Sequence, residues 1–243
     1  MARDRDAEKR RAAERSLMFV REGMRLGLGS GTTAALAVQL LGERVRQGLR
    51  VEGVSTSKQT RELAKAGGIP LITLDEASHL DLTIDGADEV DGAFRMIKGG
   101  GGALLREKVV ASVSERIVIV VDSSKLVRVL GASPLPVEVA PFAWKVVAEH
   151  LRALGGSPEL RRGSGGEAFV TEEGHYLVDC AFGRIGEPER LARALEALPG
   201  VVEHGLFLDL ADVVVVGRSD GVEVMERQAR PRRRAGAFGR AGK

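Results

Sequence analysis

The sequence predicts an α/β fold in which a doubly wound, mostly parallel sheet of the Rossmann-like type accompanies a smaller ferredoxin-like α+β domain. Three observations lead to this prediction. Strand and helix segments alternate through the first half of the chain, the run "RIVIVVD" is apolar enough for a strand covered on both faces, and a βαββαβ order begins near residue 136. We therefore expect a Rossmann-like catalytic domain at 1–132 and 208–225 and a ferredoxin-like domain at 133–207.

The elements of the first domain are predicted from apolar spacing and from glycine or proline breaks. Leucines 36, 40 and 41 recur at helical spacing after the turn "GSGTT", which indicates a helix there. The other expected segments are a helix at 7–20 ending near Gly23, strands at 24–29, 50–55, 68–73 and 80–85, helices at 57–67 and 103–115, and a strand at 116–122.

The second domain is predicted in the same way, and its elements alternate as in the split βαβ pattern. The segments are a strand at 135–140, a helix at 142–156, a strand at 158–163, a strand within 167–182, a helix at 188–200 and a strand at 201–208. The final apolar run at 211–218 is long enough for a buried strand, and we expect it to return to the first sheet.

Composition narrows the class of protein. The chain has 243 residues, 44% of them apolar, but no apolar run long enough to cross a bilayer and a charged rather than hydrophobic beginning, so we expect a cytoplasmic protein. Cys180 is the single cysteine, and the four histidines show no metal-ligand spacing. The formal charge of +2 comes from the stretch 226–243, which is rich in Arg, Gly and Ala. We interpret that stretch as a disordered basic tail and expect no nucleic-acid partner.

Three stretches rich in glycine or aspartate are expected to fall at strand ends: "GLGSGTT" (27–33), "DGADEVD" (85–91) and "KGGGG" (98–102). Ligands of open α/β sheets bind beyond the carboxyl ends of the strands, so the three are expected to meet in one crevice. The first stretch suits a phosphate at a helix N-terminus, although capping by Ser and Thr explains it equally well. Lacking the third glycine of a dinucleotide fingerprint and the Lys-Ser/Thr pair of a Walker A loop, it matches neither motif.

The other two stretches combine acidic groups with bare backbone. Asp85 and Asp88 follow an apolar strand, where aspartates either form a turn or serve a site. Successive glycine N–H groups beside Lys98 can form a concave anion nest. Glu107 lies five residues beyond Gly102 in the following helix, either turned toward the same crevice or simply exposed.

Taken together, these motifs closely resemble the type A family of ribose-5-phosphate isomerases. The resemblance is carried in order by "GSGTTAA", "DGADE", the "KGGG" and "REK" parts of 98–108, "VDSSKLV" and "PLPVEV", and it extends to about residue 224. One small departure is Gly102, where some members have alanine. The arginine-rich tail lies outside the family pattern.

The resemblance implies an isomerase that interconverts ribose 5-phosphate and ribulose 5-phosphate through an enediolate in the non-oxidative branch of the pentose phosphate pathway. It implies no metal or nicotinamide cofactor, and a homodimer or homotetramer. The implied catalytic residues are Glu107 as the base, Asp85, Asp88 and Lys98. The implied substrate-binding residues are Ser30, Gly31, Thr32, Thr33, Asp85, Gly86, Ala87, Asp88, Lys98, Gly99, Gly100, Gly101 and Lys125.

Other classes of protein are compatible with parts of the sequence. A sugar-phosphate sensor of related fold would bind such a ligand without turnover, but it would need an attached DNA-binding segment. A nicotinamide-dependent oxidoreductase rests on "GLGSG" alone. A transferase that uses coenzyme A is compatible with the fold, which by itself does not determine function.

Overall fold

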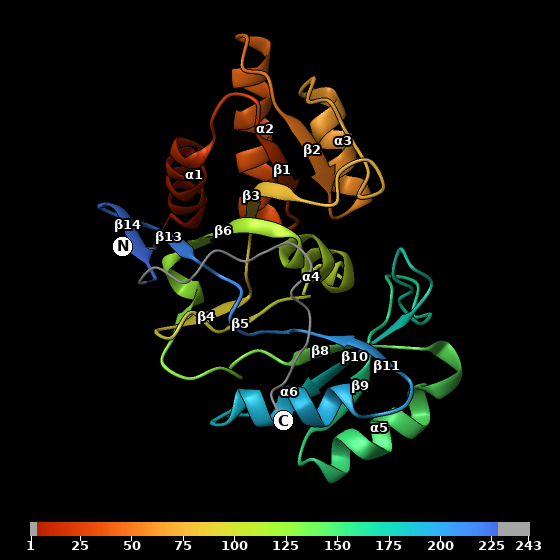
Figure 1. Ribbon diagram of the computed structural model, residues 1–243. Coiled ribbons are helices and arrows are strands. Elements are labelled where there is room, and N and C mark those ends of the chain that lie inside the picture. The colour runs from red at the N-terminus through yellow and green to blue at the C-terminus, as the bar shows by residue number, and fades with distance from the viewer. Residues whose placement is uncertain (1–3, 228–243) are drawn as a thin grey trace, which may run out of the picture. The chain divides into compact units, whose positions relative to one another are not determined.

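The computed structural model describes residues 4–227, and its ribbon is drawn in Figure 1. The chain forms two compact units. Of the described residues, unit 1 contains 4–86, Val109–Ser123 and 210–227, and unit 2 contains Ala87–Lys108 and Ser124–Asp209. The predicted tail lies, apart from its first two residues, outside the described residues.

Unit 1 is built on a six-stranded sheet with the order β14-β13-β6-β3-β1-β2. Its strands are β1 (Arg25–Leu28), β2 (Glu52–Ser55), β3 (Leu80–Asp85), β6 (Ser114–Asp122), β13 (Val213–Arg218) and β14 (Gly221–Glu226). All neighbours pair in parallel except β13 and β14, which are antiparallel. The predicted return of 211–218 to the first sheet therefore occurs as β13.

Helices cover this sheet on both faces. They are α1 (Arg5–Ser16) with a short 3-10 turn η1 (Leu17–Phe19), α2 (Thr32–Arg46), α3 (Lys58–Ala66) and α4 (Leu104–Ser112), which starts in unit 2 and ends in unit 1. One core cluster packs α1, α2 and α3 against alternate residues of β1, β3, β6 and β13. On α4, Val110 packs in a separate cluster with Val54 and Leu80. Side-chain caps explain two of the helix starts, because Asp4 accepts from the Ala7 N–H and Ser57 from the Thr60 N–H.

Unit 2 contains the ferredoxin-like arrangement. Its elements are β8 (Leu135–Val139), the 3-10 turn η3 (Pro141–Ala143), α5 (Trp144–Ala153), β9 (Ser157–Leu160), β10 (Tyr176–Ala181), α6 (Pro188–Glu196) and β11 (Val201–His204). The sheet order is β11-β8-β10-β9, and every pair is antiparallel. Val147 and Leu151 of α5 and Leu195 of α6 are buried in one core with the strand side chains. The predicted fold class, α/β with a smaller α+β part, is thereby confirmed.

A second, small sheet in unit 2 was not predicted. It has the order β12-β5-β4-β7 and consists of β4 (Glu89–Asp91), β5 (Met96–Ile97), β7 (Leu126–Val127) and β12 (Leu206–Phe207). A 3-10 turn, η2 (Ser123–Lys125), leads into β7. β12 pairs with β5, β5 with β4, and β4 with β7, so these strands form one sheet within unit 2. Residues 87–108 and 124–132 therefore lie in unit 2, whereas the sequence interpretation placed them in the first domain.

Three segments differ from their predicted form. The strand expected at 201–208 is divided into β11 and β12, which belong to different sheets. The expected strand at 68–73 is reduced to one bridge between Gly53 and Leu71. The Pro70 carbonyl accepts the Gly53 N–H, but Pro70 has no N–H of its own to continue the pairing. The helix expected to reach residue 115 ends at Ser112, since Ser114 already begins the pairing of β6 with β3. Within residues 4–227, no helix is both long and apolar enough to cross a membrane.

Candidate active site

The first group of expected site residues lies at the carboxyl ends of β1 and β3 in unit 1. The chain passes from β1 to β2 on one side, and β3 then pairs with the other side of β1. Open α/β sheets bind ligands beyond the carboxyl ends of the two strands at such a reversal of strand order, which here are β1 and β3. The loop at 29–31 and the start of α2 follow β1 at this point, and Asp85 is the last residue of β3.

Asp85 holds the loop after β1 in place. Its Oδ1 accepts the Ser30 N–H at 3.0 Å and the Gly86 N–H at 2.7 Å, and the residue is 2% exposed. The Gly29 N–H also donates to the Ile84 carbonyl at 2.9 Å. A Cβ at Gly29 would lie 2.2 Å from Asp85 Oδ1, so the close approach of the two segments requires a glycine.

The start of α2 has no side-chain cap. The cap residue is Gly31, which has no side chain to accept the first N–H groups of the helix. Thr56 donates its hydroxyl to the Leu28 carbonyl, so in the 2.6 Å contact between the two hydroxyls Ser30 is the donor to Thr56. The hydroxyl of Ser30 is thus engaged elsewhere, and the backbone N–H groups of Thr32 and its neighbours remain at the positive end of the helix dipole.

The second group of expected residues lies at one end of the small sheet in unit 2. Asp88 precedes β4 and its N–H donates to the Ile97 carbonyl at 2.8 Å, while Lys98 follows β5 and its N–H donates to the Gly205 carbonyl at 2.9 Å. Because β7 is parallel to β4, Lys125 precedes β7 at the same end of the sheet. The four consecutive glycines at 99–102, called the glycine run below, therefore follow a strand of this small sheet and not, as expected, a strand of the parallel sheet. The antiparallel pairing of β4 with β5 explains the difference.

Lys98 and Glu107 form a buried ion pair. The distance from Lys98 Nζ to Glu107 Oε2 is 3.1 Å, and the two residues are 3% and 5% exposed. Glu107 lies in the first turn of α4, where the helix dipole favours a carboxylate. The ammonium group of Lys98 also lies 5.4 Å from the centre of the Phe207 ring, within the range of a cation–π contact. An ammonium and a carboxylate are thus held together beside the glycine run.

The four glycines of the run have different surroundings. Gly99 and Gly102 have φ values of +108° and +84°, which other residues rarely adopt. The Gly100 N–H donates to Asp88 Oδ2 at 2.8 Å, and a Cβ at Gly100 would lie 2.8 Å from Asp88 Oδ1. A Cβ at Gly101 would meet nothing within 4 Å. The Gly100 N–H is therefore occupied by Asp88, and Gly101 is the most open position of the run.

Sequence reasoning missed the residues behind the ion pair. Lys108 donates to Glu203 at 2.6 Å and to the His204 carbonyl at 2.7 Å, and its ammonium lies 4.8 Å from the centre of the Phe207 ring. Burial lowers the pKa of Lys108, and Glu203 opposes this effect. Burial, together with the charge of Lys108, lowers the pKa of His204 to about 3, so that ring is neutral. The family motif contains Lys108, but nothing in the sequence indicated that the Phe207 ring would lie near the ammonium groups of both Lys98 and Lys108.

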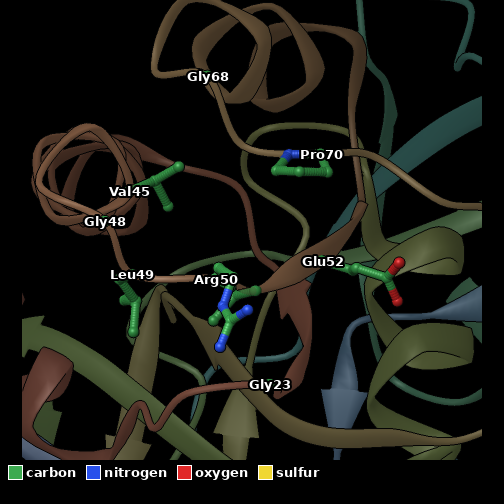
Figure 2. A pocket seen from close by; sticks show the side chains of 9 residues that line it. Gly23, Val45, Gly48, Leu49, Arg50, Glu52, Gly68 and Pro70 are labelled. Atoms are coloured by element: carbon green, nitrogen blue, oxygen red, sulfur yellow. The ribbon is translucent and has the colours of Figure 1, made fainter.

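Unit 1 also contains a surface hollow and a cluster of one histidine and two carboxylates. A hollow of about 450 Å³ lies near the amino end of β2, with Val45, Leu49 and Pro70 in its wall (Figure 2). His79, Asp81 and Glu115 have ligand atoms within 4.8 Å of one another, the residues of the described chain best placed to hold a metal ion. Both features involve the amino ends of strands, whereas Asp85 ends β3, and neither contains an expected site residue.

Comparison with known proteins gives one consistent result. Residues 52–221 match the family model of ribose 5-phosphate isomerase A, also called phosphoriboisomerase A. The ribose-5-phosphate isomerase A of Gloeobacter violaceus is 53% identical over 230 residues, which cover 94% of this chain and 100% of the relative.

Two solved structures agree with this result. A D-ribose-5-phosphate isomerase in complex with phospho-erythronic acid superposes with a TM-score of 0.90 at 38% identity, covering 92% of this chain and 100% of that one. The enzyme of Neisseria gonorrhoeae gives 0.84 at 42% identity, covering 90% and 95%. The family model spans well over half of the chain, and the relatives match nearly its whole length. The chain belongs to the ribose 5-phosphate isomerase A family.

Proposed function

We propose that Glu107 is the base, and Lys98 its electrostatic partner, in the interconversion of ribose 5-phosphate and ribulose 5-phosphate that this aldose–ketose isomerase catalyses. The observation that carries the proposal is the buried pair itself, 3.1 Å between Lys98 Nζ and Glu107 Oε2, next to backbone that carries no side chains. Burial of two opposite charges costs free energy unless they are well paired, so such a buried pair is more easily explained by chemistry than by stability.

The reaction requires one proton to move between adjacent carbons, and one carboxylate can carry it. In the direction from aldose to ketose, Glu107 takes the proton from C2. The electron pair of the C2–H bond then forms the C1=C2 double bond, and the π electrons of the C1 carbonyl move to O1. The O2 proton is then transferred to O1 while O2 becomes the new carbonyl, and Glu107 returns its proton to C1. Lys98, whose Nζ is 3.1 Å from the carboxylate of Glu107, is proposed to stabilise the enediolate oxygens with its ammonium group. The route uses no cofactor.

The two aspartates are proposed to have different roles. Asp85 Oδ1 accepts two backbone N–H groups, so we assign Asp85 to holding the loop that binds the substrate. Asp88 accepts one N–H, from Gly100, and is less buried, so we assign it to the hydroxyl protons, including the opening of the furanose ring. In Asp88→Asn, the aldose-to-ketose rate should stop rising with enzyme concentration once spontaneous ring opening becomes limiting. A rate that stays proportional to enzyme concentration, as in the parent, would contradict this assignment.

The phosphate is proposed to bind at the start of α2, and Lys125 is proposed as a further substrate-binding residue. Exposed N–H groups, the helix dipole and the hydroxyls of Thr32 and Thr33 provide the usual recognition of a phosphate dianion. In one solved relative the bound molecule is phospho-erythronic acid. That compound combines a phosphate with a carboxylate, whose two oxygens resemble the charged oxygens of an enediolate.

The setting of the enzyme is also part of the proposal. We propose a homodimer or homotetramer, working in the cytoplasm on a small charged substrate and without a nucleic-acid partner. Light scattering after gel filtration measures the oligomeric state, and a mass equal to one chain would contradict the first part.

The test of the proposed chemistry uses ribose 5-phosphate in deuterated water with no added cofactor. The parent should form ketose and incorporate solvent deuterium at C1, and Glu107→Gln should do neither at a comparable rate. Glu62→Gln is the matched control, because Glu62 is an exposed helical glutamate paired with Lys65. If Glu107→Gln and Glu62→Gln retained the same activity, Glu107 would not be the base.

A further inference from the structure

A side chain from the ferredoxin-like part of unit 2 contacts the glycine run. Arg161 directly follows β9, and its Nη1 donates to the carbonyl of Gly99 at 3.0 Å and to the carbonyl of Gly100 at 3.1 Å. Asp179 of β10 binds the other side of the guanidinium, accepting from Nε at 2.8 Å and from Nη2. The two side chains are 16% and 28% exposed, so the pair is largely shielded from solvent. One guanidinium therefore joins a carboxylate to two consecutive carbonyls of the run.

The backbone around Arg161 is itself fixed. Its N–H donates to the Leu177 carbonyl at 2.8 Å, and its carbonyl accepts from Phe169 at 2.9 Å. The Phe169 ring lies 5.8 Å from the guanidinium and is also the group that a Cβ at Gly102 would meet, at 2.7 Å. Arg161 thus reaches the run from a rigid part of the sheet, so its direction is determined by the fold.

Holding a carbonyl also fixes an N–H group. In a planar trans peptide, the C=O and the N–H of the same unit point in opposite directions. The unit between Gly99 and Gly100 accepts from Arg161 at one end and donates to Asp88 Oδ2 at the other, at 2.8 Å. The unit between Gly100 and Gly101 accepts from Arg161 in the same way, so its N–H, on Gly101, points away from the guanidinium. The Gly99 carbonyl also accepts the Gly102 N–H at 3.0 Å, so the first unit has further support. The second unit depends more strongly on Arg161, because glycines without such a partner can turn these groups.

We infer that Arg161, oriented by Asp179, is a positioning residue for the isomerisation, because it sets the direction of the Gly101 N–H and of the peptide that holds Asp88. This inference rests on the proposed function, in which the run and Asp88 contact the sugar. A cation on the carbonyl side also polarises each peptide and strengthens its N–H as a donor. Arg161 contributes to the transition state through the glycine run and does not itself touch the reacting atoms.

The experiment compares Arg161→Met with Arg162→Met. The control residue is the next arginine in the chain, and its side chain donates to the Gly166 carbonyl of its own loop instead of to the run. For Arg161→Met we expect kcat to fall by about tenfold to a hundredfold, as expected for a misplaced catalytic group, with KM changed less than about threefold. The inhibition constant of 4-phospho-erythronate should rise by a similar factor as kcat falls. The control should keep all three values.

A second variant separates positioning from folding. Arg161→Lys retains the charge but lacks the planar fork that serves Asp179 and both carbonyls, so we expect intermediate values of kcat and of the inhibition constant. If Arg161→Met does not fold, Asp179→Asn replaces it, with the same expected direction. A folded variant with the parent's kcat would overturn the inference, and so would parallel losses in the Arg162→Met control. If Glu107→Gln were still inactive in that case, only the inference would fail, whereas an active Glu107→Gln would instead reject the proposed function.

Discussion

Replacing Glu107 with Gln perturbs two quantities that can be measured separately. The change keeps the size of the side chain and removes the carboxylate that we assign as the base. It also removes a carboxylate that pairs with Lys98, a residue that is only 3% exposed. We expect a loss of rate from the first effect and a loss of stability from the second, and only the first should remain when Lys98 is also neutralised.

The magnitudes follow from the geometry of the pair. At the observed 3.1 Å, the two charges attract by about 5 kcal/mol for an effective dielectric constant of about 20, before desolvation is subtracted. Removing one partner of a buried pair leaves an uncompensated charge and costs about 3–5 kcal/mol. The free energy of unfolding should therefore fall by about that amount in Glu107→Gln. The double variant Lys98→Met/Glu107→Gln should recover a large part of it. The loss of general-base catalysis should lower kcat by roughly a hundredfold or more.

The assays are urea unfolding for stability, and isomerisation with solvent deuterium incorporation for the rate. The double variant is the informative control, since it should be more stable than Glu107→Gln and just as inactive. The reasoning fails if Glu107→Gln is folded and isomerises within a few-fold of the parent. The electrostatic part fails separately if the double variant is no more stable than the single one.

Three further predictions concern substrate contacts and stability. Thr32→Ala and Lys125→Ala should each raise KM by roughly fivefold with little change in kcat, since a substrate contact remote from the reacting carbons contributes about 1 kcal/mol of uniform binding; unchanged steady-state KM values would remove both residues from the proposed set of substrate-binding residues. Gly101→Ala should lower kcat/KM by about tenfold or more without changing Tm, whereas Gly186→Ala, where a Cβ also meets nothing within 4 Å, should change neither; equal activity of the two variants would contradict a close approach of the substrate. The pKa of His204 is about 3 in the folded protein, against 6.5 for the free group. As pH falls below 6.5, this histidine binds a proton in the unfolded chain but not in the folded one, so the parent protein loses stability. His204→Gln should therefore lose about 2 kcal/mol less stability than the parent between pH 7 and pH 5, and parallel unfolding curves at the two pH values would reject this.

The central sheet could be predicted from the sequence because its strands are long and almost uniformly apolar. β6 and β13 are typical, with five consecutive buried residues or more in each, and no helical spacing competes with this pattern. The small sheet could not be predicted in the same way. β5 and β12 have two residues each, and β12 pairs with a segment more than a hundred residues away, so neither periodicity nor local turn chemistry marks them.

The same distinction applies to the candidate site. Ser30, Asp85, Asp88 and the glycine run were found because local composition at the end of a strand is unusual and because the motifs resemble a family. Arg161 lies 61 residues from Gly100 in the chain, and within "PELRRG" it is simply one of two adjacent arginines. Only the fold distinguishes it from Arg162, since the two side chains bind different carbonyls.

The structure separates the glycines of the run that the fold requires from the one that it does not, a distinction that the sequence alone could not make. Gly99 and Gly102 are required by their positive φ values, and Gly100 by the carboxylate of Asp88, so these three would be retained in a chain that bound nothing. Gly101 has neither constraint, since its φ is ordinary and a Cβ there would project into open space. The fold therefore accounts for three of the glycines, and the need for a ligand to approach the backbone rests on the fourth. A methyl group at Gly101 is for this reason a more direct probe of substrate contact than any change to its three neighbours, where lost activity would also follow from a displaced loop.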